Sequence, residues 1–208
     1  MYYSQIGQDQ YYIENVARHR RNGFFLDIGA YDGLEGSNTA TLEFEYGWTG
    51  ICVEANPYLF HSLTNNRPNS KIVSCAAWHT NGATELEIPT VDIDRIPGAQ
   101  LSRISNIERN ENYFRDHFSS DVLRTTVPCL TVDSLLGEHP PVIDYMSLDV
   151  EGVEIEVLRG IDFSKIDIRF MTIEHGDRPG YLESFERYLS PFGYKIHRVN
   201  RWDVEFEK

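Results

Sequence analysis

The chain is poor in cysteine and lacks long apolar runs, and both absences exclude classes of protein. Its 208 residues include three cysteines, whose odd number and spacing fit no disulfide framework, metal site or redox motif. We therefore predict that Cys52, Cys75 and Cys129 are buried free thiols in a reducing compartment. No apolar run approaches the roughly 20 residues that cross a bilayer, and residues 1–10 are too polar for a signal peptide. We expect a soluble, cytoplasmic protein without a membrane span.

Positive charge is also scarce. The chain carries 32 acidic residues against 19 lysines and arginines, so its formal net charge is −13. This charge repels nucleic-acid phosphates at long range, and we expect no nucleic-acid partner. The basic triplet His19-Arg20-Arg21 is interpreted as a solvated face, and further arginines lie between Arg95 and Arg124.

Strand-like and helix-like segments alternate along the chain. Buried strands are predicted at 24–28, 49–54, 71–77, 144–150 and 169–174. Helices are predicted at 37–46, from 56 onward, at 151–158 and at 181–189. The segments 194–199 and 202–206 should close the chain as an antiparallel pair. This order predicts an α/β fold, with helices on both faces of a mostly parallel sheet.

The segment 89–125 interrupts this alternation. It is polar, and a helix at 106–118 is its one predicted element. A hairpin arm at 83–88 is expected before it and a strand at 126–132 after it. The segment is too long for a plain connection. We therefore expect a single domain, 1–208, with 89–125 as a lid or substrate-binding insertion.

The loop DIGAYDG follows the first predicted strand. Gly29 and Gly33 permit a sharp turn that lets the backbone approach a ligand, and Asp27 can accept hydrogen bonds from an ammonium group or from loop amides. Tyr31 replaces the middle glycine of a dinucleotide fingerprint, which disfavours a pyrophosphate. The next strand ends at Glu54, at the separation of about 20 residues expected for an acid that binds ribose hydroxyls. The pattern predicts a ribose-bearing ligand without a pyrophosphate.

Five motifs occur in order along the chain. They are SQIGQD at 4–9, FFLDIGAYDG at 24–33, SNT at 37–39, GICVEANP at 50–57 and SLDVEGVEIEVLRG at 147–160. Together they resemble the FkbM-type methyltransferases over 4–174, most weakly across 89–125. The resemblance implies a Rossmann-like class I methyltransferase, with a seven-stranded sheet that ends in the antiparallel pair. It also implies methyl transfer from S-adenosyl-L-methionine to an oxygen.

The resemblance further implies a set of cofactor residues. These are Gln8, Asp9, Asp27, Gly29, Ala30, Tyr31, Gly33, Ser37, Asn38, Glu54, Ala55, Asn56, Ala76, Ala77, Trp78 and Asp149. The loop residues would line the methionine part, Glu54 and the two residues after it the adenosine, and 76–78 the adenine. Gln8 and Asp9 would close over the amino-acid end of the cofactor, or alternatively only cap the first helix.

Carboxylates and a histidine follow two neighbouring predicted strands. Asp149, Glu151, Glu174 and His175 should face one crevice, because ligands of open α/β sheets bind at the carboxyl ends of the strands. An alcohol needs a base, or a metal that stabilises its alkoxide. Asp149 is the first candidate for the base and His175 the second, and Glu174 either contacts substrate or orients a neighbour. Asp149, Glu174 and His175 are alternatively the ligands of a divalent cation such as Mg²⁺. Glu151 is interpreted as a first-turn acid of the next helix.

The acceptor is less sharply defined. The insertion offers groups that suit the hydroxyls and apolar face of a sugar: Arg95, Arg103, Arg109, Arg115, Arg124, Asn106, Asn110, Asn112, Tyr113, Phe114 and His117. We expect a sugar hydroxyl, such as that of a deoxyhexose in a glycan, and a chain that is free-standing or one domain of a larger glycan-modifying protein. A polyketide or other small hydroxylated metabolite is the alternative acceptor. A non-catalytic nucleoside-binding module and a nucleotide-dependent oxidoreductase are the competing classes.

Overall fold

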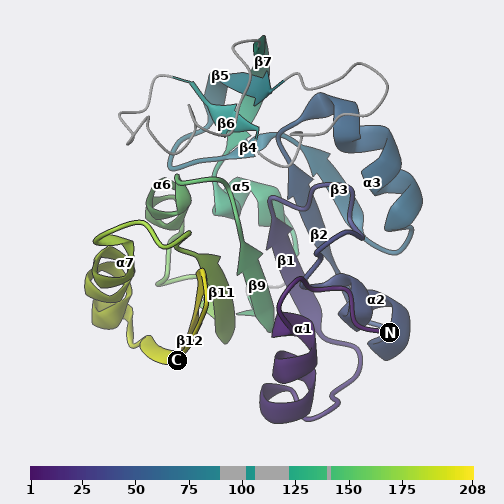
Figure 1. Ribbon diagram of the computed structural model, residues 1–208, viewed down its shortest axis with the longest axis vertical. Helices are drawn as coiled ribbons and strands as arrows, with labels where there is room; N and C mark the ends of the chain where they lie inside the picture. The colour runs from purple at the N-terminus through teal and green to yellow at the C-terminus, as the bar shows by residue number, and fades with distance from the viewer. Residues whose placement is uncertain (90–101, 106–121, 140–141) are drawn as a thin grey trace.

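The computed structural model describes residues 1–89, 102–105, 122–139 and 142–208 (Figure 1). A seven-stranded sheet has the order β12-β13-β11-β9-β1-β2-β3. Its strands are β1 (Phe24–Ile28), β2 (Thr49–Glu54), β3 (Lys71–Ser74), β9 (Tyr145–Leu148), β11 (Phe170–Glu174), β12 (Lys195–Asn200) and β13 (Asp203–Glu207). The strands from β3 to β11 are parallel, whereas β13 pairs antiparallel with both β11 and β12. The mostly parallel sheet and its closing antiparallel pair are therefore confirmed.

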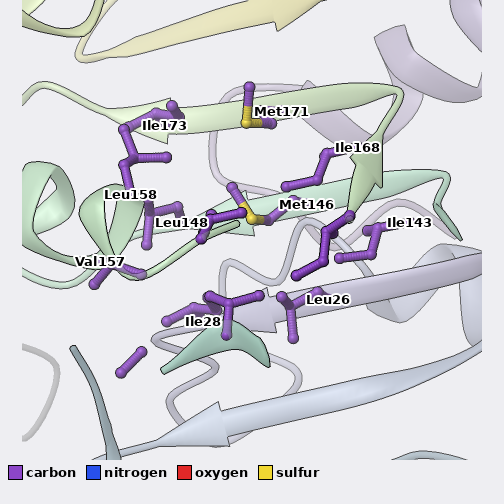
Figure 2. Packing of buried hydrophobic residues seen from close by; sticks show 14 of the residues in the cluster. Leu26, Ile28, Ile143, Met146, Leu148, Val157, Leu158, Ile168, Met171 and Ile173 are labelled. Carbon is purple, nitrogen blue, oxygen red and sulfur yellow. The ribbon is translucent and has the colours of Figure 1, made fainter. Parts of the chain in front are cut away.

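Helices cover both faces of this sheet, as predicted. Leu26 and Ile28 of β1 belong to a core that includes Val157 and Leu158 of α6 (Glu154–Arg159), as Figure 2 shows. Helices α5 (Val132–Leu136) and α7 (Tyr181–Leu189) contribute to the same core. Phe25 points to the other face, where the core includes residues from η1 (Tyr12–Val16), α2 (Ala40–Tyr46) and α3 (Phe60–Asn66). Alternate residues of β1 thus pack into the cores on opposite faces of the sheet, because successive side chains of a strand point to opposite faces.

A second, four-stranded sheet lies above the large sheet in Figure 1 and has the order β4-β7-β5-β6. Its strands are β4 (Ala76–Ala77), β5 (Gly82–Pro89), β6 (Arg103–Ile104) and β7 (Val122–Leu130). The expected hairpin arm is β5, and its antiparallel partner is β7. The prediction of one strand at 71–77 was wrong, because Ala76 leaves the large sheet and pairs with Cys129. The helix expected at 106–118 lies outside the described residues.

Two boundaries near the carboxyl edge of the sheet differ from the prediction. Strand β9 ends at Leu148, so Asp149 and Val150 belong to the following loop. Helix α6 begins only at Glu154, because Glu151 and Gly152 adopt φ values of 57° and 98°. These left-handed conformations are incompatible with an α-helix. The interpretation of Glu151 as a first-turn acid of that helix was therefore wrong.

All three cysteines are free and buried, as predicted. Within the described part of the chain, no helix combines the length and apolar character that a membrane crossing requires.

Candidate active site

A cavity of about 450 Å³ lies at the carboxyl edge of the large sheet. Ile28, Glu54 and Leu148, at the ends of β1, β2 and β9, line one side of it, and Leu86 and Ile104 of the second sheet also line it. This volume falls within the range of small-molecule sites. The position at the carboxyl ends of the strands is the one predicted for the ligand.

The loop after β1 is held close to its neighbours. The backbone N–H groups of Gly29 and Ala30 both donate to the Val53 oxygen at 3.0 Å. Gly29 has φ 85°, and a β-carbon there would lie 1.6 Å from the backbone oxygen of Asp149. Tyr31 adopts φ 52°, and its N–H donates to Glu54 Oε2 at 2.9 Å. Glycine at position 29 therefore allows this loop to pack directly against the backbone of Asp149.

Glu54 ends β2 with its carboxylate fixed at the cavity. Its Oε2 accepts from Tyr31, and its Oε1 accepts from the Asn56 N–H at 2.7 Å. Burial raises the pKa of Glu54 to about 7, although the backbone hydrogen bonds oppose this shift. The remaining lone pairs of the carboxylate can accept from hydroxyl groups of a ligand.

Asp27 is oriented by a buried arginine that sequence reasoning did not identify. Thr39 Oγ1 donates to Asp27 Oδ2 at 2.5 Å, and Arg67 Nη1 lies 3.7 Å from the same oxygen. Burial raises the pKa of Asp27, while Arg67 and Thr39 oppose the shift. Arg67 also donates from Nε to Glu43 Oε2 at 2.7 Å and from Nη1 to the Gly33 oxygen at 3.2 Å. Arg67 therefore fixes both ends of the loop and the helix that follows it.

Two polar side chains close the cavity from the N-terminal half of the chain. Gln8 Nε2 donates to Asp203 Oδ2, a residue of β13 that the sequence did not suggest, and both side chains line the cavity. Burial raises the pKa of Asp203 to about 6, and the hydrogen bond from Gln8 opposes it. Asn38 Nδ2 donates to Ser147 Oγ at 3.0 Å. Asn38 Oδ1 is buried without a hydrogen-bond partner among the described residues, so it can accept one from a ligand.

Carboxylates dominate the part of the cavity near β9 and β11. Oxygens of Asp149, Glu154 and Glu174 all lie within 4.8 Å of one another. Arg178 Nη1 approaches Glu174 Oε2 at 3.4 Å and Glu154 Oε2 at 3.8 Å. The Asp149 side chain is exposed at the cavity. The surrounding protein nevertheless raises the pKa of Asp149 well above the ordinary value, first by desolvation and then through the charges of Glu174 and Glu151. Desolvation and neighbouring carboxylates also raise the pKa of Glu174 to about 8. The pair therefore retains a proton near neutral pH.

The structure brings together most of the residues predicted for the site. Those that line the cavity are Gln8, Asp27, Gly29, Ala30, Tyr31, Ser37, Asn38, Glu54, Ala55, Ala76, Ala77, Asp149 and Glu174. His175 does not line it: the ring is buried, Nδ1 accepts from the Asp177 N–H at 3.2 Å, and Nε2 has no hydrogen-bond partner among the described residues. The buried Glu154, which does not line the cavity either, lies beside Asp149 and Glu174 where His175 was expected.

Four expected cofactor residues also lie outside the lining. Asp9 is buried and accepts from the Tyr3 N–H and Thr41 Oγ1, so it joins the N-terminal segment to α2. Asn56 is the N-cap of η2 (Pro57–Leu59). The oxygen of Gly33 accepts from Arg67, and the Trp78 N–H donates to the Leu130 oxygen. Their observed contacts hold the framework of the site together.

Known methyltransferases share this sequence pattern and fold. The family model of the methyltransferase FkbM domain matches residues 27–196. The structure is similar to methyltransferase FkbM from Methylobacillus flagellatus KT, with 16% identity and a TM-score of 0.58 over 99% of this chain and 48% of that one. It is also similar to a METTL16 methyltransferase domain, with 13% identity and a TM-score of 0.51 over 96% and 65% of the two chains. The human methyltransferase 10 domain containing protein is similar as well, with 12% identity and a TM-score of 0.50 over 96% of this chain and 80% of that one. No curated protein sequence matches the chain.

The strand order and these likenesses define a Rossmann-like class I methyltransferase fold. Because the family model covers most of the sequence, the chain belongs to the FkbM methyltransferase family. That family is one of S-adenosylmethionine-dependent methyltransferases. The chain spans about half the length of the FkbM structure that it matches.

Proposed function

We propose that the chain transfers the methyl group of S-adenosyl-L-methionine to a hydroxyl oxygen. One observation carries this proposal: Glu54, the candidate ribose ligand, and the carboxylates Asp149 and Glu174 line the same cavity. A donor nucleoside bound at Glu54 and an acceptor hydroxyl beside Asp149 would share one enclosed space. Holding the two reactants together in this way is the main task in methyl transfer.

The residues at the Glu54 end suit the donor. Glu54 can accept from the ribose hydroxyls, and the small side chains Ala55, Ala76 and Ala77 leave room for the adenine. Gly29 and Ala30 line the cavity, so the loop after β1 can contact the methionine part of the donor. Asn38 Oδ1, an acceptor without a partner among the described residues, suits the ammonium group of the donor.

The residues at the other end suit activation of an alcohol. The hydroxyl oxygen attacks the methyl carbon, the carbon–sulfur bond breaks, and its electron pair stays on the sulfur. Asp149 accepts the hydroxyl proton, and a raised pKa makes its carboxylate a stronger base than an ordinary aspartate. The proton that the pair retains near neutral pH would then reside on Glu174, which leaves Asp149 ionised and able to accept the hydroxyl proton.

The acceptor that we propose is a sugar hydroxyl, such as that of a deoxyhexose in a glycan, with a polyketide or other small hydroxylated metabolite as the alternative. Ser102 and Ile104 of the insertion line the cavity, which supports a role of 89–125 in acceptor binding. Arg103 and Arg124 both donate to the Glu87 carboxylate, so these two stabilise the second sheet. The other residues suggested for sugar contact lie outside the described residues. The catalytic chain would work alone or as one domain of a larger glycan-modifying protein.

A divalent cation such as Mg²⁺ is a second means of activating the hydroxyl. Ligand oxygens around one Mg²⁺ or Ca²⁺ lie within about 5 Å of each other, because metal–oxygen bonds measure 2.0–2.6 Å. Asp149, Glu154 and Glu174 meet this requirement. Enzyme treated with a strong chelator would lose activity and regain it with Mg²⁺ under this alternative. Full activity after the treatment would exclude it and leave Asp149 as the base.

The proposal is tested by incubating the protein with labelled donor and a panel of glycans, free sugars and polyketides, and identifying the product by mass. Asp149→Asn should leave S-adenosylhomocysteine affinity largely intact and reduce turnover by about 10²–10⁴-fold. Glu183→Gln, an exposed change on α7, is the matched control. Lost cofactor affinity with normal turnover at saturating donor would contradict the role of Asp149.

Ligand-dependent unfolding separates the competing classes. S-adenosylhomocysteine should stabilise the fold by about 2.7 kcal/mol at a hundredfold excess over its dissociation constant. Stabilisation by NAD instead would favour an oxidoreductase. Stabilisation by S-adenosylhomocysteine without turnover on any acceptor would favour a nucleoside-binding module.

A further inference from the structure

A second cavity lies at the opposite edge of the large sheet from the candidate active site. It has a volume of about 560 Å³. Phe24, Thr49 and Lys71 line it, and they are the first residues of β1, β2 and β3. The candidate active site lies where β1 and β2 end. The two cavities are therefore separated by the length of these strands.

The lining of this second cavity is basic, although the chain carries a net charge of −13. Arg20, Lys71, His139 and Arg169 line it, and Asp144 is the one acidic residue among its described lining. Arg20 belongs to the triplet that the sequence suggested was merely a solvated face. A concentration of positive charge in a hollow of an acidic protein attracts anions to that point.

Asp144 fixes the two arginines without using up their donors. Nη1 of Arg20 and Nη1 of Arg169 lie 2.6 and 2.5 Å from the same Asp144 oxygen. Asp144 is itself anchored, because its Oδ2 accepts from the Phe24 N–H at 3.0 Å. Both arginine side chains remain about half exposed, at 47% and 52%. Each guanidinium carries five N–H donors, so both retain donors for a further anion.

An aromatic surface adjoins these charges. The rings of Phe24 and His139 are stacked, with centroids 5.5 Å apart and an interplanar angle of 29°. Both residues line the cavity together with Lys71. Arginine forks match phosphate geometry, and a flat ring pair offers a face for a planar base.

We propose that this cavity binds a nucleoside phosphate. Arg20, Arg169 and Lys71 would hold the phosphate groups, and the base would lie against Phe24 and His139. The volume falls within the range of sites for small ligands. The proposal is independent of the methyl transfer proposed above, since it uses no residue of that cavity.

The test is calorimetric titration with UDP, inorganic pyrophosphate and uridine. S-adenosylhomocysteine is present throughout to occupy the first cavity. UDP should bind most tightly, pyrophosphate less tightly, and uridine at least about tenfold more weakly than UDP. No binding of either anion at about 1 mM would overturn the proposal, as would equal binding of uridine and UDP. Pyrophosphate binding as tight as that of UDP would overturn the nucleoside part and indicate a phosphate site.

Charge variants test the location of the site. Arg169→Gln and Arg20→Gln should each weaken UDP binding about fivefold or more. Arg187→Gln removes the same charge from an exposed position on α7 and should have no effect. Asp144→Asn should strengthen UDP binding, because it removes the competing anion while its amide oxygen can still accept from Phe24. Misfolding weakens binding and therefore cannot imitate the expected gain. Weaker UDP binding by an Asp144→Asn protein that is folded would overturn the assignment.

Discussion

Gly29 faces the backbone oxygen of Asp149 so closely that a β-carbon at position 29 would lie 1.6 Å from it. The proposed donor loop and the loop that carries Asp149 therefore meet backbone to backbone. The Asp149 N–H also donates to the Ile28 oxygen at 3.0 Å, which continues the pairing of β1 and β9 to this point. Any residue larger than glycine must move one of these two elements.

Gly29→Ala should destabilise the fold by more than about 1 kcal/mol and weaken S-adenosylhomocysteine binding. The reasons are the steric overlap and the positive φ of 85°. Denaturant unfolding and calorimetry measure the two effects. Gly82→Ala is the control, because a β-carbon there meets nothing within 4 Å. Unchanged cofactor affinity in a stable Gly29→Ala protein would contradict the role of the loop.

Arg67→Met should cost about 3–5 kcal/mol in the free energy of unfolding, because it leaves buried carboxylates unpaired. Both side chains of the Arg67–Glu43 pair are fully buried. Arg67→Lys should not restore stability, since an ammonium cannot reproduce the fork that reaches Glu43, Thr39 and Gly33. Arg159→Met breaks an exposed ion pair with Glu156 and should cost less than about 1 kcal/mol. Equal losses in both methionine variants would argue against the Arg67 network.

Stability should depend on pH through Glu54. Burial raises its pKa from 4.5 to about 7, so between these pH values the folded state binds a proton that the unfolded state has released. The contribution of Glu54 is fully present below pH 4.5 and is lost as pH rises through 7. The unfolding free energy of the native chain minus that of Glu54→Gln should fall by up to roughly 3 kcal/mol from pH 5 to pH 8. A difference that is flat or rises with pH would contradict the assignment.

The titration of Asp149 should respond to its neighbour. Its pKa is raised by desolvation first and by the charge of Glu174 second. Glu174→Gln removes the charge and keeps the shape, so the Asp149 pKa should fall while remaining above the ordinary value. Carbon-13 NMR of the aspartate carboxyl groups measures this without knowledge of the acceptor. The control Glu183→Gln should leave the titration unchanged, and an unmoved Asp149 pKa in Glu174→Gln would show that the two groups are not coupled.

The sequence predicted the large sheet well because its strands are continuous apolar runs that end in identifiable loops. Leu26 and Ile28 are apolar in sequence and occupy a core in the structure. The split of 71–77 could not be predicted, since Ala76 and Cys129 pair across more than fifty residues. Glu151 was misassigned because its left-handed φ of 57° arises from the loop geometry rather than from residue preference.

Part of the candidate site could also be predicted from local patterns. Asp27, Gly29 and Glu54 have characteristic positions relative to their strands, and all three line the cavity. Arg67 escaped notice because its partners Glu43 and Thr39 lie more than twenty residues away and give no local signal. His175 was proposed because it follows a strand end and its imidazole can accept a proton, but its ring is buried outside the cavity.

The hydrogen bond between Gln8 and Asp203 has a consequence for the timing of biosynthesis. The two residues are 195 positions apart, and both belong to the cavity wall. A ribosome that adds about 5–20 residues per second needs roughly 10–40 s between them. The parallel strands can pair during that interval while the wall is incomplete. Cofactor capture should therefore be among the last events in the maturation of a nascent chain.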